Sequence, residues 1–150
     1  MASEFFYDVQ VKWNNDRKGT LTSAVLDDFI EVATPPEFNK GIAGMWSPEH
    51  LLVAAVNSCL MTTFLAIADN SRLPFTSFLS KAKGKLEMVE GKYMISEITL
   101  APEVAVASDE HIEKAARVLQ KAEANCLIAN SIKAKIIFQP QVVTELPELV

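Results

Sequence analysis

Apolar and polar side chains alternate near the start of the chain, and this period of two predicts a β-strand over residues 5–13. The polar run over residues 14–19 contains turn residues, and residues 20–23 and 28–33 have the pattern of two further strands. Residues 34–46 include two prolines and two glycines and predict a loop with one short helical turn. The first third of the chain is therefore expected to consist of short strands.

The longest apolar segment of the chain follows and predicts a helix that starts at Ser47-Pro48-Glu49. Serine can cap a helix, proline suits its first position, and an acidic side chain favours the positive end of the helix dipole. Residues 51–68 are apolar nearly all round, and a membrane span is the competing interpretation. The acidic residues at both ends and four polar residues inside favour a buried central helix without a membrane: Asn57, Ser58, Thr62 and Thr63.

Two long strands are expected next, over residues 78–89 and 92–106, with Glu90-Gly91 as their hairpin turn. Ser108-Asp109-Glu110 predicts the start of a second helix, whose apolar stripe continues to Cys126. A last strand is predicted over residues 134–138, and the tail beyond it is expected to fray.

This order of elements predicts an α+β fold, not a series of βαβ units, in a single domain that spans residues 1–150. A helix that is apolar on every face needs cover on every face. One small antiparallel sheet and one further helix can cover only two sides. A two-fold homodimer, in which the remaining side packs on a second copy, is therefore expected.

Composition narrows the range of functions. The chain has 150 residues and is 49% hydrophobic, and its net charge of −5 argues against nucleic acid as a partner. It has two cysteines and no CxxC motif, so neither a metal site nor a disulfide framework is indicated. The first residues lack the basic region of a signal peptide, which favours the cytoplasm.

Cys59 and Cys126 are the candidate chemical groups. Taken alone, each is more often a small core residue than a catalyst. A Cys–His hydrolase that uses His50 or His111 is an alternative, but His50 lies nine positions from Cys59 and no nucleophile elbow is visible. Both histidines stand at helix starts, where exposure to solvent is expected.

Two segments resemble one known family. Residues 47–60, SPEHLLVAAVNSCL, and residues 122–131, AEANCLIANS, are similar to the first-cysteine and second-cysteine segments of the osmotically inducible protein C and organic hydroperoxide resistance (OsmC/Ohr) family. The order of elements and the length also match, so the resemblance covers nearly the whole chain. It implies an OsmC-like intertwined homodimer, and a cysteine-based peroxidase without metal or cofactor that acts at the dimer interface.

The resemblance also implies roles for four residues. Cys59 would be the peroxidatic cysteine and Cys126 the resolving one, and the family's glutamate and arginine correspond to Glu49 and Arg17. A guanidinium is always protonated and would stabilise the thiolate that attacks a peroxide. Glu49 precedes Cys59 by ten positions, about 15 Å of helical rise, so a Glu49 that helps to build the Cys59 site either reaches the thiol of the other subunit or requires a helix that bends or begins later. We expect the first, with Glu49 orienting Arg17.

The implied substrate is an organic hydroperoxide, and the implied reductant is an external dithiol, commonly a lipoylated protein. Apolar side chains near Glu49 and Cys59 are candidates for a pocket that holds an alkyl tail: Met45, Trp46, Met61 and Phe64. The alternative function is a non-catalytic dimer of the same fold that senses redox state or binds a ligand.

Overall fold

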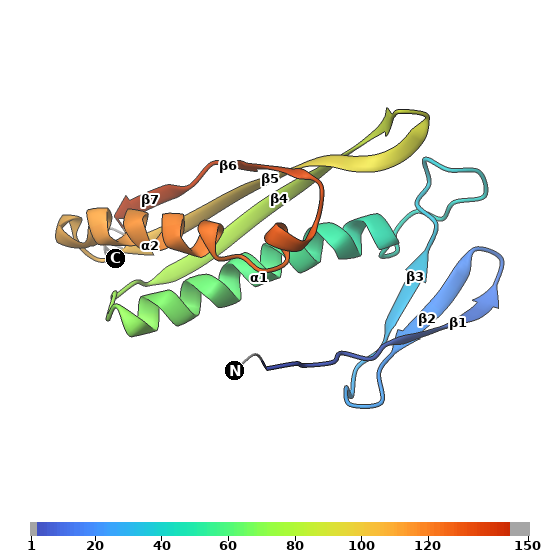
Figure 1. Ribbon diagram of the computed structural model, residues 1–150, viewed down its shortest axis with the longest axis horizontal. Coiled ribbons are helices and arrows are strands. Elements are labelled where there is room, and N and C mark those ends of the chain that lie inside the picture. Colours follow the sequence, from blue (N-terminus) through green and yellow to red (C-terminus); the bar gives the residue numbers. More distant parts are fainter. Residues whose placement is uncertain (1–2, 145–150) are drawn as a thin grey trace, which may run out of the picture. The chain divides into compact units, whose positions relative to one another are not determined.

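The computed structural model describes residues 3–144, which include three short strands, a long helix and a second sheet with its own helix (Figure 1). The chain divides into two compact units, residues 1–51 and 52–150. The single domain expected from the sequence stays a prediction.

The first unit contains an antiparallel sheet of three strands in the order β1-β2-β3. The strands are β1 (Gln10–Asn15), β2 (Lys18–Thr22) and β3 (Ile30–Ala33). The strand expected over residues 5–13 begins only at Gln10, which pairs with Thr22, the last residue of β2. Residues 5–9 have no neighbouring strand in this unit, so the prediction was wrong there: an alternating pattern permits a strand, but only a partner forms it.

The start of the long helix α1 (Pro48–Asn70) is fixed to this sheet by the backbone of Trp46. The Ala33 amide donates to the Trp46 carbonyl at 2.9 Å, and Val32 and Trp46 form a parallel β-bridge. Ser47 is fully buried, and its hydroxyl accepts a hydrogen bond from the His50 amide at 3.1 Å. This is the helix cap that the sequence predicts.

The second unit contains a four-stranded sheet with β5 at its centre (Figure 1). Its elements after α1 are β4 (Ser77–Val89), β5 (Lys92–Val106), the short 3₁₀ helix η1 (Asp109–His111), α2 (Ile112–Ala124), the 3₁₀ helix η2 (Ala129–Ser131), β6 (Lys135–Phe138) and β7 (Gln141–Thr144). The hairpin turn between β4 and β5 lies at Glu90 and Gly91, whose φ angles of 49° and 81° are typical of a type I′ turn. The predicted hairpin is confirmed.

The sheet of the second unit is mixed, not antiparallel as expected. β6 and β7 both run parallel to β5, with Leu100 opposite Phe138 and Val104 opposite Val142. The α2 crossover returns the chain in the direction of β5, which is the connection that parallel pairing requires. Residues 141–144 form β7 instead of fraying, because β5 is long enough to pair with two short strands in succession; residues 145–150 lie outside the described part.

The core of the second unit lies between one face of α1, the sheet and α2. The helix buries Val56, Leu60, Phe64 and Ala68, which recur every four residues, against a cluster that includes Leu119. Between these positions, Met61 and Leu65 keep 38% and 41% of their surface exposed. The expected cover on every face of the helix is therefore not found within one chain.

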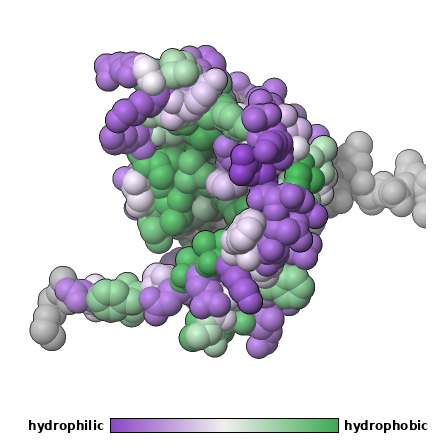
Figure 2. Space-filling model, turned by 90° about the vertical axis from the view of Figure 1, so that its right-hand side faces the viewer, coloured by the Kyte–Doolittle hydropathy of each residue, from purple (hydrophilic) through white to green (hydrophobic). Residues whose placement is uncertain are grey.

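Hydrophobic side chains reach the surface in both units, and Figure 2 shows green, hydrophobic residues over a wide part of the face in view. Within the described residues, α1 is long and apolar enough to cross a membrane. The core helices of soluble proteins also meet these criteria of length and composition.

Candidate active site

Cys59 lies in the middle of α1, at the edge of the face that packs on the core. Asn57 fixes this part of the helix to β4: its amide donates to the Ser80 carbonyl at 2.9 Å, and the Ser80 hydroxyl donates back to the Asn57 carbonyl oxygen at 2.6 Å. Gly84 permits the close approach of the strand, because a Cβ atom there would lie 2.6 Å from Val53 Cγ2. The position of Cys59 along the sheet is thus well determined, and its side chain is half-buried.

Cys126 contacts α1 one turn before Cys59. The sequence places it near the end of the second helix, but α2 ends at Ala124 and Cys126 lies in the bend that leads to η2. Its side chain is fully buried, and its thiol donates to the Val56 carbonyl with a sulfur–oxygen distance of 3.8 Å. Val56 precedes Cys59 by three residues, so the two cysteines meet across one helical turn.

Both thiols are free, and each affects the pKa of the other. Burial alone would raise the pKa of the Cys59 thiol, but hydrogen bonds to the thiolate outweigh it and the pKa is lowered. Burial raises the pKa of Cys126, and the hydrogen bond and negative charge of Cys59 raise it further. The Cys59 thiol therefore ionises at a lower pH than the Cys126 thiol.

Backbone amides supply much of the stabilisation of the Cys59 thiolate. The donors are the backbone of Ile128, the Cys126 thiol, the Thr63 hydroxyl and the backbone of Leu127, in decreasing order of their effect on the pKa. The amide donors and Thr63 are not among the site residues predicted from the sequence. An amide is common to all residues except proline, so no residue type marks such a site; only the fold that brings residues 127–128 to α1 creates it.

Arg17 and Glu49, the other two predicted site residues, lie in the first unit, whereas both cysteines lie in the second. Arg17 is an exposed residue of the β1–β2 turn, and no ion pair joins it to Glu49 within residues 3–144. The Glu49 oxygen Oε1 is buried and accepts no hydrogen bond from the described residues. A buried carboxylate oxygen without a donor is unusual and indicates a missing partner. The roles of both residues stay predictions.

The histidines make other contacts. His50 Nδ1 lies 2.7 Å from the Ser47 hydroxyl, and His111 Nε2 lies 3.2 Å from a carboxylate oxygen of Glu110. Neither contact supplies a base to Cys59, so nothing in these contacts supports a Cys–His hydrolase. Among the described residues, no group of three His, Cys, Asp or Glu side chains is placed to hold a metal ion.

The four residues predicted to line an apolar pocket differ in their surroundings. Phe64 is fully buried in the core, where its ring lies 5.2 Å from that of Phe75 and 4.9 Å from that of Phe78, measured between centroids. Phe64 therefore packs the core. Met45 and Trp46 line an open hollow of about 320 Å³ in the first unit, together with Gly44 and His50.

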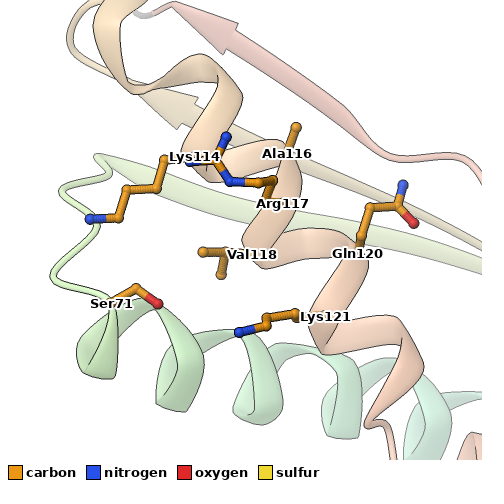
Figure 3. A pocket seen from close by; sticks show the side chains of 7 residues that line it. All are labelled: Ser71, Lys114, Ala116, Arg117, Val118, Gln120 and Lys121. Atoms are coloured by element: carbon orange, nitrogen blue, oxygen red, sulfur yellow. The ribbon is translucent and has the colours of Figure 1, made fainter.

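A groove lies between α1 and α2. It has a volume of about 470 Å³, and Thr63 is the residue of its lining closest to Cys59 along α1. Ser71 and Lys121 line this groove and also a neighbouring one of about 490 Å³, shown in Figure 3. There Lys114 and Lys121 extend from α2 beside Ser71, which follows α1.

The chain is similar to several known proteins. Residues 41–140 match the family model described as OsmC-like protein. The chain is 26% identical over 134 residues to the peroxiredoxin OsmC of Escherichia coli, covering 88% of this chain and 93% of that protein. It is 25% identical over 144 residues to the uncharacterized protein YmaD of Bacillus subtilis, covering 93% of each. A solved OsmC-like protein of unknown function from Vibrio cholerae has the same fold, with a TM-score of 0.81 at 23% identity over 91% of this chain and 99% of that one.

Proposed function

The chain belongs to the OsmC-like protein family, and from this premise we propose that it is a thiol peroxidase that reduces organic hydroperoxides with Cys59 and Cys126. The observation that carries the proposal is that Cys126 packs on the turn of α1 before Cys59, with both thiols free, the pKa of Cys59 lowered and that of Cys126 raised. This is the division of labour that a peroxidatic and a resolving cysteine need. The relationship to a protein named peroxiredoxin OsmC supports it.

The proposed reaction has three steps. The Cys59 thiolate attacks the terminal oxygen of the hydroperoxide, the S–O bond forms, the O–O bond breaks, and the alkoxide takes up a proton and leaves as an alcohol. The resulting sulfenic acid of Cys59 condenses with the Cys126 thiol, which forms a disulfide and releases water. An external dithiol then reduces the disulfide by exchange and is itself oxidised to a disulfide. A lipoylated protein is the class of dithiol that the family resemblance suggests.

We further propose that the working unit is a homodimer in the cytoplasm. Its support is the exposed apolar face of α1, with Met61 and Leu65, and the exposed apolar side chains of the first unit. The unpartnered Oε1 of Glu49 supports the proposal that a guanidinium, that of Arg17, pairs with it across the dimer. Sedimentation equilibrium tests the dimer: Met61→Lys and Leu65→Lys, which place charges on that face, should yield monomer, and a monomeric wild type would contradict it.

Turnover tests the function. Wild-type protein with a dithiol such as dihydrolipoate and an organic hydroperoxide should consume many equivalents of peroxide. Cys59→Ser should consume none. With one equivalent of peroxide and no dithiol, Cys126→Ser should stop as the sulfenic acid, because a dithiol could itself reduce that acid. A single oxidation of the wild type without turnover under several dithiols would favour a redox sensor instead. Equal reactivity of the two variants would contradict the assigned roles.

A further inference from the structure

Two adjacent threonines of α1 contact different atoms of the same cysteine. The Thr63 hydroxyl lies 3.9 Å from the Cys59 sulfur, one helical turn away. The Thr62 hydroxyl instead donates to the Cys59 backbone carbonyl at 3.1 Å. Thr63 is half-buried and Thr62 is exposed. Only the first of these hydroxyls is therefore placed to respond to the charge of the sulfur.

The direction of the Thr63 hydrogen bond follows from the state of the sulfur. A thiol can donate or accept, but a thiolate can only accept, so the hydroxyl must donate once Cys59 ionises. This contact is among those that lower the pKa of Cys59. The amides of Leu127 and Ile128 come from the chain after α2, whereas Thr63 belongs to α1 itself, one helical turn from Cys59.

Thr63 also has a side that faces a groove on the surface. It lines the groove between α1 and α2, whose other walls include Ile67 and Asn125. Its hydroxyl therefore lies between this groove and the Cys59 sulfur, and Thr63 is not a residue that only fills the core.

We propose that Thr63 is a catalytic residue, whose hydroxyl donates to the Cys59 thiolate and holds the sulfur for attack on the peroxide. The inference rests on the proposed function for its catalytic meaning. In the attack, two electrons of the thiolate form the S–O bond, the O–O bond breaks, and the alkoxide takes a proton from solvent. Thr63 keeps its own proton throughout and stabilises the anion before the reaction.

The test is the pKa of Cys59 in Thr63→Val, which removes the hydroxyl and keeps the branched shape. In a Cys126→Ser background only one thiol reports, and the pH dependence of its alkylation by iodoacetamide gives the pKa without any peroxide. We expect a rise of about 0.5–1 unit, about three- to tenfold less thiolate at neutral pH, with the alkylation rates converging at high pH. Thr63→Ser should restore the wild-type profile, and the matched control Thr62→Val should leave it unchanged.

An unchanged profile in Thr63→Val would overturn the inference, as would an equal shift in Thr62→Val. If the valine variant does not fold, Thr63→Ala provides the same comparison with Thr62→Ala. The rate of oxidation by cumene hydroperoxide should follow the same pH shift. A shifted alkylation profile without peroxide turnover in any variant would refute the peroxidase while leaving Thr63 as a thiolate donor, so the two failures can be told apart.

Discussion

Substitution of Ile128 by proline removes one backbone hydrogen-bond donor from the Cys59 site and is compatible with the backbone conformation there. Ile128 has φ −69° and ψ −43°, and proline fixes φ near −65°, so the ring fits the existing backbone. Its amide takes no part in the backbone hydrogen bonds of this segment, in which Asn130 donates to Cys126 and Ser131 to Ile128. The Cys59 sulfur is the acceptor that would lose its donor.

A hydrogen bond to an ionised group contributes about 1.5–3 kcal/mol, and one pKa unit corresponds to about 1.36 kcal/mol. Because Cys59 is only half-buried and solvent screens its charge, we take the lower end and expect a rise of about one unit in its pKa. Ile128→Ala is the matched control, since it loses the same side chain and keeps the amide. The assay is the pH profile of alkylation in the Cys126→Ser background, with thermal unfolding to verify the fold. Equal pKa values in the two variants would refute the amide contribution.

Three further outcomes follow from the packing and the charges. In the wild type, iodoacetamide near neutral pH should label Cys59 before Cys126, because the pKa of Cys59 is lowered and that of Cys126 is raised. The masses of the two cysteine peptides report the labelling, and equal labelling would contradict this expectation. The free energy of unfolding should fall as pH rises through and above about 9, the ordinary thiol pKa, because folded Cys126 holds its proton more tightly; Cys126→Ala should lessen the decline, and an identical decline would contradict it. Gly84→Val should reduce the unfolding free energy in urea by about 1–3 kcal/mol through its clash with Val53, while Ser77→Val, on the exposed end of β4, should not.

The elements could be predicted where local chemistry determines them. Ser47-Pro48 marks the start of α1, and Glu90-Gly91 marks a turn that needs two positive φ angles, so both were found from residue types alone. The parallel pairing of β6 and β7 with β5 was not predicted, because alternation identifies a strand but not its neighbour. For the same reason residues 5–9 were expected to form a strand that they do not form.

The site shows a similar division. The sequence motifs identify Cys59 and Cys126, and the structure brings them into contact. The donors from Ile128 and Leu127 carry no signal in the sequence, since they belong to the backbone. Thr63 was first noted only as a polar residue within an apolar helix, and its role depends on the rotamer that brings its hydroxyl to the sulfur. Arg17 and Glu49 rest on the resemblance, with one buried, unpartnered oxygen in their support.

Formation of the Cys59–Cys126 disulfide tests the central claim most directly. One equivalent of cumene hydroperoxide is added to the reduced protein, and free thiols and intact mass are followed under denaturing conditions without reductant. The account predicts the loss of both thiols from a single chain, a mass lower by two hydrogen atoms, and a disulfide-linked peptide pair that contains both cysteines. Retention of the Cys126 thiol beside a stable sulfenic or sulfinic Cys59, or a disulfide between chains, would contradict it.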